Sequence, residues 1–321
     1  MAYQFEISEP IDVGVRRIAM ELIDDAIARV EAADRDRHEV VHEVRKNCKR
    51  LRGLLRLIRP VAPKLYRAEN KRFRDATAPL SGLRDAEASL ESYDALLDAF
   101  RDEVDRQALA PVRRALTLHK QHMAENVADL DARLDQFGKR MHKARKKVPD
   151  WHIPGDDPFG DDSGFELVGG GLTKTYERGR EAMQKAFDEP SIERFHEWRK
   201  RAKYLRYHLR LLRPAWPQLL KPMRGEVKDL GDLLGDDHDL AVLETALTQA
   251  VSTGADRGRR DILRALMRQR SIHLREHAYW LGRRVYAEGP KAFRKRIGCY
   301  WATARDEYRD AYPLGAGGVP K

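Results

Sequence analysis

Cysteines and long apolar runs are both scarce in this chain of 321 residues. The two cysteines, Cys48 and Cys299, cannot build a disulfide framework and form no CxxC zinc pattern. No stretch approaches the roughly 18 uninterrupted apolar residues of a membrane span, and the first residues lack a basic region followed by an apolar run. We therefore expect no membrane span, no secretory signal, no membrane partner and a cytoplasmic location.

The common phosphate-binding, dinucleotide-binding and serine-nucleophile motifs are absent as well. The sequence contains no Walker A loop, no GxGxxG in a strand context and no GxSxG, and Gly169–Gly171 follow no predicted strand. We therefore expect neither an enzyme nor a bound cofactor.

Charge is what the chain has in abundance. Charged residues make up 35% of the sequence, and 61 Lys and Arg against 51 Asp and Glu give a net charge of +10. An excess of positive charge favours an anionic partner.

Apolar residues recur at helical spacing along most of the chain, while strand-like alternation is nearly absent. This periodicity predicts helices over 13–33, 39–58, 64–80, 83–100, 102–147, 173–188, 191–212, 217–234, 238–251, 256–286 and 290–312. Residues 148–171 are rich in Pro, Gly and Asp and lack the helical period, so we interpret them as a linker. The linker separates a first half, residues 1–147, from a second half, residues 172–321.

The two halves are copies of one another. HEVRKNCKRLRGLLRLIRP, residues 42–60, aligns without gaps on HEWRKRAKYLRYHLRLLRP, residues 196–214, with 12 of 19 positions identical. The same offset of 154 residues pairs Arg114 with Arg268 and His119 with His273. A constant register over this length predicts an internal duplication and two similar bundles related by a pseudo-two-fold axis.

The repeated helix carries an apolar stripe and a basic stripe side by side. The apolar stripe is Val41, Val44, Cys48, Leu51, Leu55 and Ile58, repeated as Phe195, Trp198, Ala202, Leu205, Leu209 and Leu212. One residue further along, the basic stripe is His42, Arg45, Lys49, Arg52, Arg56 and Arg59, repeated as His196, Arg199, Lys203, Arg206, Arg210 and Arg213. One residue is a rotation of about 100° on an α-helix, so the basic stripe borders the core.

The charge of the whole chain is concentrated in these two segments. Each has seven Lys or Arg and one Glu, a net charge of +6, so the remaining residues are close to neutral. Lys46 and Lys200 widen the stripe in both halves; Arg50 does so only in the first, because Tyr204 replaces it. Either these cations pair with acidic residues of neighbouring helices, or they bind an anionic ligand that offsets their mutual repulsion.

Histidines and aspartates allow a metal site as an alternative. His42 with Glu43 would need two further ligands, and the helical spacing of His119 and His122 has no counterpart in the second half. The run Asp236, Asp237 and Asp239 around His238 is equally typical of a helix start after a break at Gly235. We therefore expect no metal, and we interpret the histidines as donors to an anion or as interhelical struts.

The two stretches His42, Arg45, Lys49, Leu51, Arg52 and His196, Arg199, Lys203, Leu205, Arg206, with the turns from Leu80 to Arg84-Asp85 and from Leu234 to His238-Asp239, resemble the conserved-histidine α-helical domain, or CHAD, family. The resemblance implies an all-α fold of two pseudo-symmetric four-helix bundles, with basic residues of both halves lining a central cavity. It also implies binding of inorganic polyphosphate and association with polyphosphate granules. Some members carry a triphosphate-tunnel module with an ExExK start, which this chain lacks.

We therefore predict a polyphosphate-binding protein. The predicted binding residues are His42, Arg45, Lys46, Lys49, Arg50, Arg52, Arg56, Arg84, Arg114, His119, His196, Arg199, Lys200, Lys203, Arg206, Arg210, His238, Arg268 and His273. Two alternatives remain open at this point: a helical protein that binds nucleic acid, and a metal-dependent phosphohydrolase.

Overall fold

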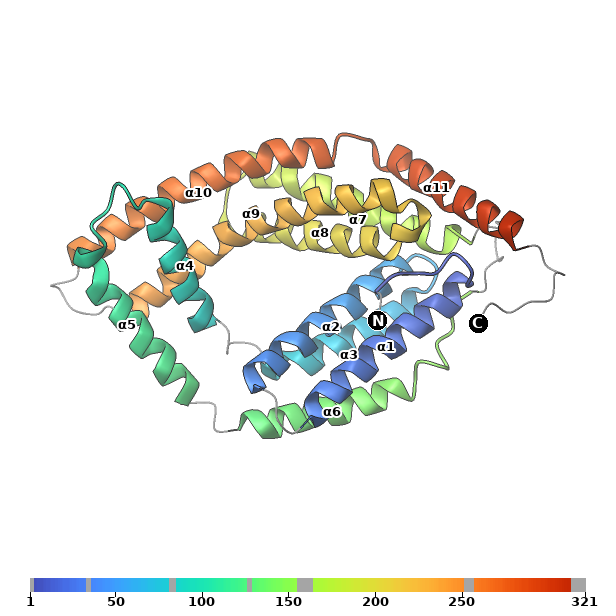
Figure 1. Cartoon of the computed structure of the whole chain (residues 1–321), viewed down its shortest axis with the longest axis horizontal. Helices are drawn as coiled ribbons and strands as arrows, with labels where there is room; N and C mark the ends of the chain where they lie inside the picture. The colour runs from blue at the N-terminus through green and yellow to red at the C-terminus, as the bar shows by residue number, and fades with distance from the viewer. Residues whose placement is uncertain are drawn as a thin grey trace.

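The computed structural model describes residues 3–32, 36–80, 85–125, 129–154, 164–250 and 257–312, which form helices and no β-strand (Figure 1). The predicted all-α class is confirmed. The α-helices are α1 (Ile11–Glu31), α2 (Arg37–Leu57), α3 (Pro63–Thr77), α4 (Asp85–Ala99), α5 (Arg106–Glu125), α6 (Leu130–Arg145), α7 (Glu166–Asp188), α8 (Ile192–Leu211), α9 (Pro217–Ala250), α10 (Arg257–Val285) and α11 (Pro290–Ala311). Short 3₁₀ turns, η1 (Ala78–Leu80) and η2 (Arg213–Ala215), follow α3 and α8.

The two basic helices begin behind side-chain caps. The Asp36 carboxylate accepts a hydrogen bond from the His38 backbone N–H at 2.8 Å, and the Ser191 hydroxyl accepts one from the Arg194 backbone N–H at 3.2 Å. Such caps satisfy N–H groups that have no partner within the helix. The starts of α2 and α8 are therefore encoded locally in both halves.

The order of the helices follows the repeat. A shift of 154 residues carries the starts of α1, α2 and α3 onto those of α7, α8 and α9 within one residue. The same shift places α4 on the second part of α9 and α5 on α10. Each helix of the first half from α1 to α5 thus has a helical counterpart in the second.

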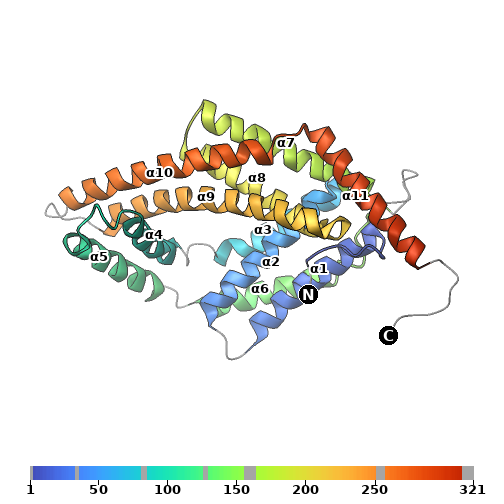
Figure 2. The ribbon, with the colours of Figure 1, turned by 45° about the horizontal axis from the view of Figure 1, so that its top comes forward.

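Buried apolar residues gather in two clusters that both halves share. Figure 2 shows α4 and α5 beside the left ends of α9 and α10. The larger cluster holds residues of α1, α2, α3, α6, α7, α8, α11, the first part of α9 and the last part of α10. The smaller one joins α4 and α5, through Leu96 and Leu116, to the second part of α9 and to α10, through Leu243 and Leu263. Helices α4 and α5 of the first half therefore share one core with α9 and α10 of the second half.

The predicted helix break at Gly235 is wrong, because α9 runs without interruption from Pro217 to Ala250. Leu234 lies in the larger cluster and Leu240 in the smaller, so burial on both sides of the glycine keeps the helix intact. A Cβ atom at Gly235 would lie 3.2 Å from an Arg199 guanidinium nitrogen. The glycine makes room for an arginine instead of turning the chain, and Asp236 lies within the helix and not at its start.

Two further predicted boundaries differ from the structure. Helix α7 already begins at Glu166, so the last residues of the predicted linker 148–171 are helical. A Cβ atom at Gly171 would lie 1.8 Å from the Leu57 carbonyl oxygen, so this glycine lets α7 press against the end of α2. The single helix predicted over 102–147 is the pair α5 and α6, which pack on different clusters.

Candidate functional site

The two basic helices meet where α2 contacts α8. His208 Nε2 donates a hydrogen bond of 3.0 Å to the Gly53 carbonyl oxygen, and a Cβ atom at Gly53 would lie 3.0 Å from the Tyr207 ring. Gly53 and Tyr207 occupy equivalent positions of the repeat, so the small residue of one copy receives the large residue of the other. This pair brings the basic stripes of both halves together.

Each basic stripe borders the core, as the repeat spacing predicts. Val44, Leu51 and Leu55 are fully buried on α2, and their counterparts on α8 are likewise buried. Most stripe residues are half-buried, whereas His42 and Lys49 are exposed. Half-burial removes part of the water that would otherwise screen one cation from the next.

Cations from both halves crowd around Lys203. Burial is the largest cause that lowers the pKa of this lysine to about 7, and the charges of Arg199, Lys49 and Arg206 lower it further. The charge of Asp239 acts in the opposite direction. Lys49 comes from α2 and the other cations from α8, so cations of both stripes lie near Lys203 where α2 contacts α8.

A second group of cations continues the first along α8. Burial lowers the pKa of Arg210, and the neighbouring charges of Arg50, Arg224 and Arg213 lower it further. Arg50 belongs to α2 and Arg224 to α9, so three helices contribute. We use the name crossing cluster for Lys49, Arg199, Lys203, Arg206, Arg210 and Arg224.

Tyrosine rings cover part of the basic surface near the crossing. The Arg56 guanidinium carbon lies 4.1 Å from the centre of the Tyr204 ring and 5.8 Å from that of Tyr66. Arg59 lies 4.9 Å from the same Tyr66 ring. Such cation–π contacts leave the edge of a guanidinium able to bind an anion. Burial and the charges of Arg201, Arg59 and Arg56 together lower the pKa of Arg178 on α7, which extends the basic surface.

Two arginines of the first half, Arg45 and Arg52, have hydrogen-bond partners that their counterparts lack, although the Nε atom of Arg56 in the same half is buried without one. Arg45 donates a hydrogen bond of 2.7 Å to the Leu80 carbonyl oxygen, and Arg52 Nε donates one of 3.1 Å to Asn70. In the second half, the Nε atom of Arg199 is buried and has no hydrogen-bond partner.

The position equivalent to Asn70 shows the same contrast. It holds Arg224, whose Nε atom is also buried without a hydrogen-bond partner. The second half therefore has the guanidinium of Arg224 at the position where the first half has the Asn70 amide oxygen that accepts from Arg52. Unpaired buried donors are costly, so a ligand that accepts their hydrogen bonds is favoured.

The predicted histidines differ between the halves in the same way. The rings of His196 and His238 lie 4.3 Å apart, and the Nδ1 atoms of both are buried without a hydrogen-bond partner. Burial, followed by the nearby His238, Lys200 and Arg199, lowers the pKa of His196 to about 4. Burial and Arg199 also lower the pKa of His238. His42 is exposed instead, 3.8 Å from Glu43.

Two predicted residues are paired with carboxylates. Lys46 Nζ lies 2.8 Å from Glu43, and Lys200 is paired with Glu197. Both pairs recur at equivalent positions, so this outer column of the stripe is neutralised in each half. For Lys46 and Lys200, pairing with acidic residues is therefore the better interpretation than binding of an anionic ligand.

Four predicted residues lie on helices that pack around the smaller cluster. Arg114 and His119 are on α5, exposed and half-buried respectively. Arg268 and His273 are exposed on α10, and the His273 ring lies 4.2 Å from that of His277. The structure does not join these four to the crossing cluster. Arg84 lies outside the described residues.

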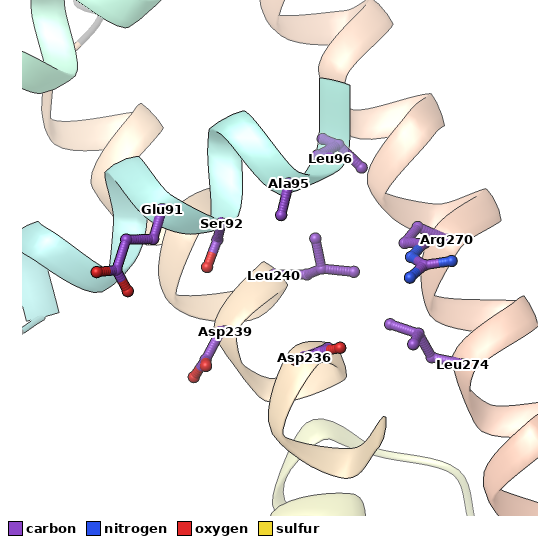
Figure 3. A pocket seen from close by; sticks show the side chains of 9 residues that line it. All are labelled: Glu91, Ser92, Ala95, Leu96, Asp236, Asp239, Leu240, Arg270 and Leu274. Carbon is purple, nitrogen blue, oxygen red and sulfur yellow. The ribbon is translucent and has the colours of Figure 1, made fainter. Parts of the chain in front are cut away.

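An acidic cavity of about 180 Å³ lies between α4, α9 and α10 (Figure 3). Carboxylates line it together with apolar walls and one cation: Glu91, Ser92, Ala95, Leu96, Asp236, Asp239, Leu240, Arg270 and Leu274. Burial and the neighbouring Asp239 raise the pKa of Asp236. The charge of Asp239 also raises the pKa of Lys203, so Asp239 lies between this cavity and the crossing cluster.

The start of α2 contains a metal-binding spacing that sequence analysis did not identify. His38, Glu39 and His42 have the HExxH arrangement of zinc proteases, and all three are exposed. Within the described parts of the chain, no group of three or more His, Cys, Asp or Glu is arranged to hold a metal ion. The spacing therefore places two imidazoles one helical turn apart and supplies no further ligand from those parts.

Sequence analysis also missed Tyr66, Asn70, Arg178 and Arg224. A signal existed for Arg224, since extending the repeat register into α3 aligns it with Asn70. Tyr66 and Arg178 carry no such signal, because their contacts depend on how α3 and α7 pack beside α2 and α8.

Comparison with known protein families identifies the family of this chain. The family model of the CHAD domain matches residues 17–248, which include both basic helices and most of α9. The chain belongs to the CHAD family. The fold also resembles the crystal structure of the CHAD domain from the plant Ricinus communis, with a TM-score of 0.53 and 19% sequence identity. That match covers 90% of this chain and 94% of the plant one.

A comparison with curated protein sequences finds no match. In the described part of this CHAD protein, no helix combines the length and the apolar character that crossing a membrane requires.

Proposed function

We propose that this CHAD protein binds inorganic polyphosphate at the crossing cluster. The observation that carries the proposal is the surroundings of Lys203, where burial and three cations from two helices lower the pKa of the lysine to about 7. A row of phosphates beside these side chains would convert their repulsion into attraction. The CHAD resemblance, which implies polyphosphate binding, points in the same direction.

Binding would be electrostatic. Arginine donates two parallel hydrogen bonds to non-bridging phosphate oxygens, and lysine acts as a point charge. The buried Nε atoms of Arg199 and Arg224 would gain acceptors that the free protein does not give them. Release of counterions from the polyanion would add affinity that decreases with salt.

Polyphosphate fits the site better than nucleic acid does. Single-stranded nucleic acids gain affinity by stacking bases on free aromatic rings. Trp198 is fully buried, and the Tyr204 ring is already covered by Arg56. The site thus offers charge without an open stacking platform. Association with polyphosphate granules in the cytoplasm would follow from such binding.

Titration calorimetry with long and short polyphosphates, ATP, DNA and RNA tests the proposal. Engagement of about six contacts predicts a slope near −4 for log affinity against log salt, and more than tenfold weaker binding at 200 than at 50 mM salt. ATP, with few phosphates, should show a shallower slope. Nucleic acid that binds more tightly than long polyphosphate, or a slope near −1, would contradict the proposal. Phosphate release on adding Mg²⁺ or Mn²⁺ would favour a phosphohydrolase instead.

A further inference from the structure

Helix α10 carries a basic and partly apolar outer face. It runs along the border of the molecule in both views, with α9 beside it (Figures 1 and 2). Its 29 residues give a rod about 43 Å long at the usual rise per residue. One side of the rod packs on α9, α4 and α5, and near its end Gly282 faces Trp198 of α8 and Met183 of α7. The other side includes residues that have no part in the proposed polyphosphate site.

Three large apolar side chains are exposed on this side. Ile262 is 52% exposed, Ile272 60% and Trp280 58%. Spacings of ten and eight residues keep the three within roughly a quarter turn of one another on an α-helix. A line of exposed Ile and Trp along one helix face marks an interaction surface.

Positive charge is in excess along this apolar line. The helix contains nine arginines against two acidic residues, Asp261 and Glu276, which are exposed on the same side. Arg264 and Arg275 pair with Glu244 and Asp237 of α9 and do not belong to this side. Arg268, Arg283 and Arg284 are exposed, and the Arg283 guanidinium lies 5.6 Å from the centre of the Trp280 ring. We use the name α10 outer face for Ile262, Arg268, Ile272, Trp280, Arg283 and Arg284.

We propose that the α10 outer face docks on an anionic lipid surface, with the helix lying in the plane of the headgroups. Helices of this kind place Trp and aliphatic side chains at the boundary of the acyl chains, while Arg side chains bind the lipid phosphates. Each basic residue near an anionic bilayer adds about 1 kcal/mol of attraction. A helix that lies on a bilayer does not need to span it. The proposed lipid partner therefore differs from the expectation, drawn from the lack of a membrane span, that the protein has no membrane partner.

Charge decides between a lipid surface and a second copy of the chain. Two α10 outer faces brought together would gather six exposed arginines and only four exposed carboxylates, those of Asp261 and Glu276 in each copy, so like charge would be in excess. The apolar residues also follow a line on a convex rod instead of lining a groove, so a flat partner with negative charge is the better fit. Arg283 beside Trp280 has the amphipathic character typical of a bilayer interface.

Vesicle co-sedimentation tests this docking. The full chain should bind vesicles of phosphatidylcholine with phosphatidylglycerol and not vesicles of phosphatidylcholine alone. The double variant Ile272→Ser/Trp280→Ser should bind about tenfold more weakly. Arg283→Glu/Arg284→Glu should lose at least twentyfold, which corresponds to about 1 kcal/mol for each arginine lost, before any repulsion by the new carboxylates. The tryptophan emission should shift to the blue on binding, and Trp280→Phe should abolish the shift.

Matched controls separate this face from the general charge of the protein. Leu118→Ser/Ile192→Ser removes equally exposed apolar side chains elsewhere, and Lys71→Glu/Arg101→Glu makes the same charge change elsewhere. Equal losses in controls and face variants would overturn the proposal, as would binding that survives Ile272→Ser/Trp280→Ser. A dimer in solution that the same variant dissolves would assign the face to a second copy and overturn the lipid partner.

Discussion

The two halves of this CHAD protein share a basic helix but not its surroundings. In the first half, the Leu80 carbonyl oxygen accepts from Arg45 and Asn70 accepts from Arg52. In the second half, the equivalent arginine Arg199 has a buried Nε atom without a hydrogen-bond partner, and Arg224 replaces the asparagine. Arg45 and Arg52 are therefore satisfied within the first half, whereas the Nε atoms of Arg199 and Arg224 in the second half have no acceptor. Arg56 is the exception in the first half, since its Nε atom is also buried without a hydrogen-bond partner.

The largest expected effect comes from reversing charges in one half at a time. Lys203→Glu/Arg206→Glu should weaken polyphosphate binding more than a hundredfold, because two charge-assisted contacts are lost in a half-buried setting. The matched variant Lys49→Glu/Arg52→Glu, at equivalent positions of the first half, should lose about tenfold. Titration calorimetry measures both variants.

Circular dichroism controls for the fold of these variants. Each substituted residue flanks the core without belonging to it, so the helical signal should not change. Equal losses of affinity in the two folded variants would contradict the claim that the second half contributes more to polyphosphate binding than the first.

A smaller effect is expected from pH, and it depends on Lys203. A bound polyanion should raise the pKa of this lysine from about 7 toward its ordinary value near 10.4, so binding takes up a proton. Affinity should then be insensitive to this group below pH 7 and fall about tenfold between pH 7 and pH 8.5. Lys203→Arg, which keeps its charge, should remove that decrease. The exposed counterpart Lys49→Arg should leave the profile unchanged, and calorimetry at three pH values distinguishes the outcomes.

The same lysine affects the stability of the free protein. The unfolded chain keeps its proton up to a pH near 10.4, whereas the folded chain loses it near 7. Between these values the unfolded state binds more protons, so the contribution of Lys203 to the free energy of unfolding rises with pH.

The smallest expected effect exchanges one partner between the halves. Arg224→Asn gives the second half the residue that binds Arg52 in the first, and it should raise the free energy of unfolding by about 1 kcal/mol. Polyphosphate affinity should fall about fivefold, since one cation is lost. The reverse change, Asn70→Arg, should act in the opposite direction on both quantities. Urea denaturation and calorimetry measure them, and a destabilised Arg224→Asn would show that the asparagine is not what satisfies the first half.

The sequence predicted the helical class and the two basic stripes, because both follow from periodicity within one helix. The aligned repeat also showed one difference between the halves, the replacement of Arg50 by Tyr204. It did not predict the continuity of α9, because a glycine followed by aspartates is locally typical of a helix start. Burial of Leu234 in one cluster and Leu240 in the other outweighs that local preference.

Contacts between helices were beyond a sequence argument. The cation–π contact of Arg56 with Tyr204 joins residues of different halves, and no spacing within the chain encodes their distance. The glycines of α7 were interpreted as a linker for the same reason. Only the packing of Gly171 against Leu57 shows that a side chain there would not fit.

Helix α9 also has a consequence for how the protein unfolds. Because one uninterrupted helix contributes Leu230 to the larger cluster and Leu243 to the smaller, loss of either cluster exposes apolar surface on the same rod. The two cores should therefore act as one cooperative unit in hydrogen exchange, with the amides around Gly235 among the slowest to exchange. Because helices of both copies share one core, the two copies should unfold together in a single transition.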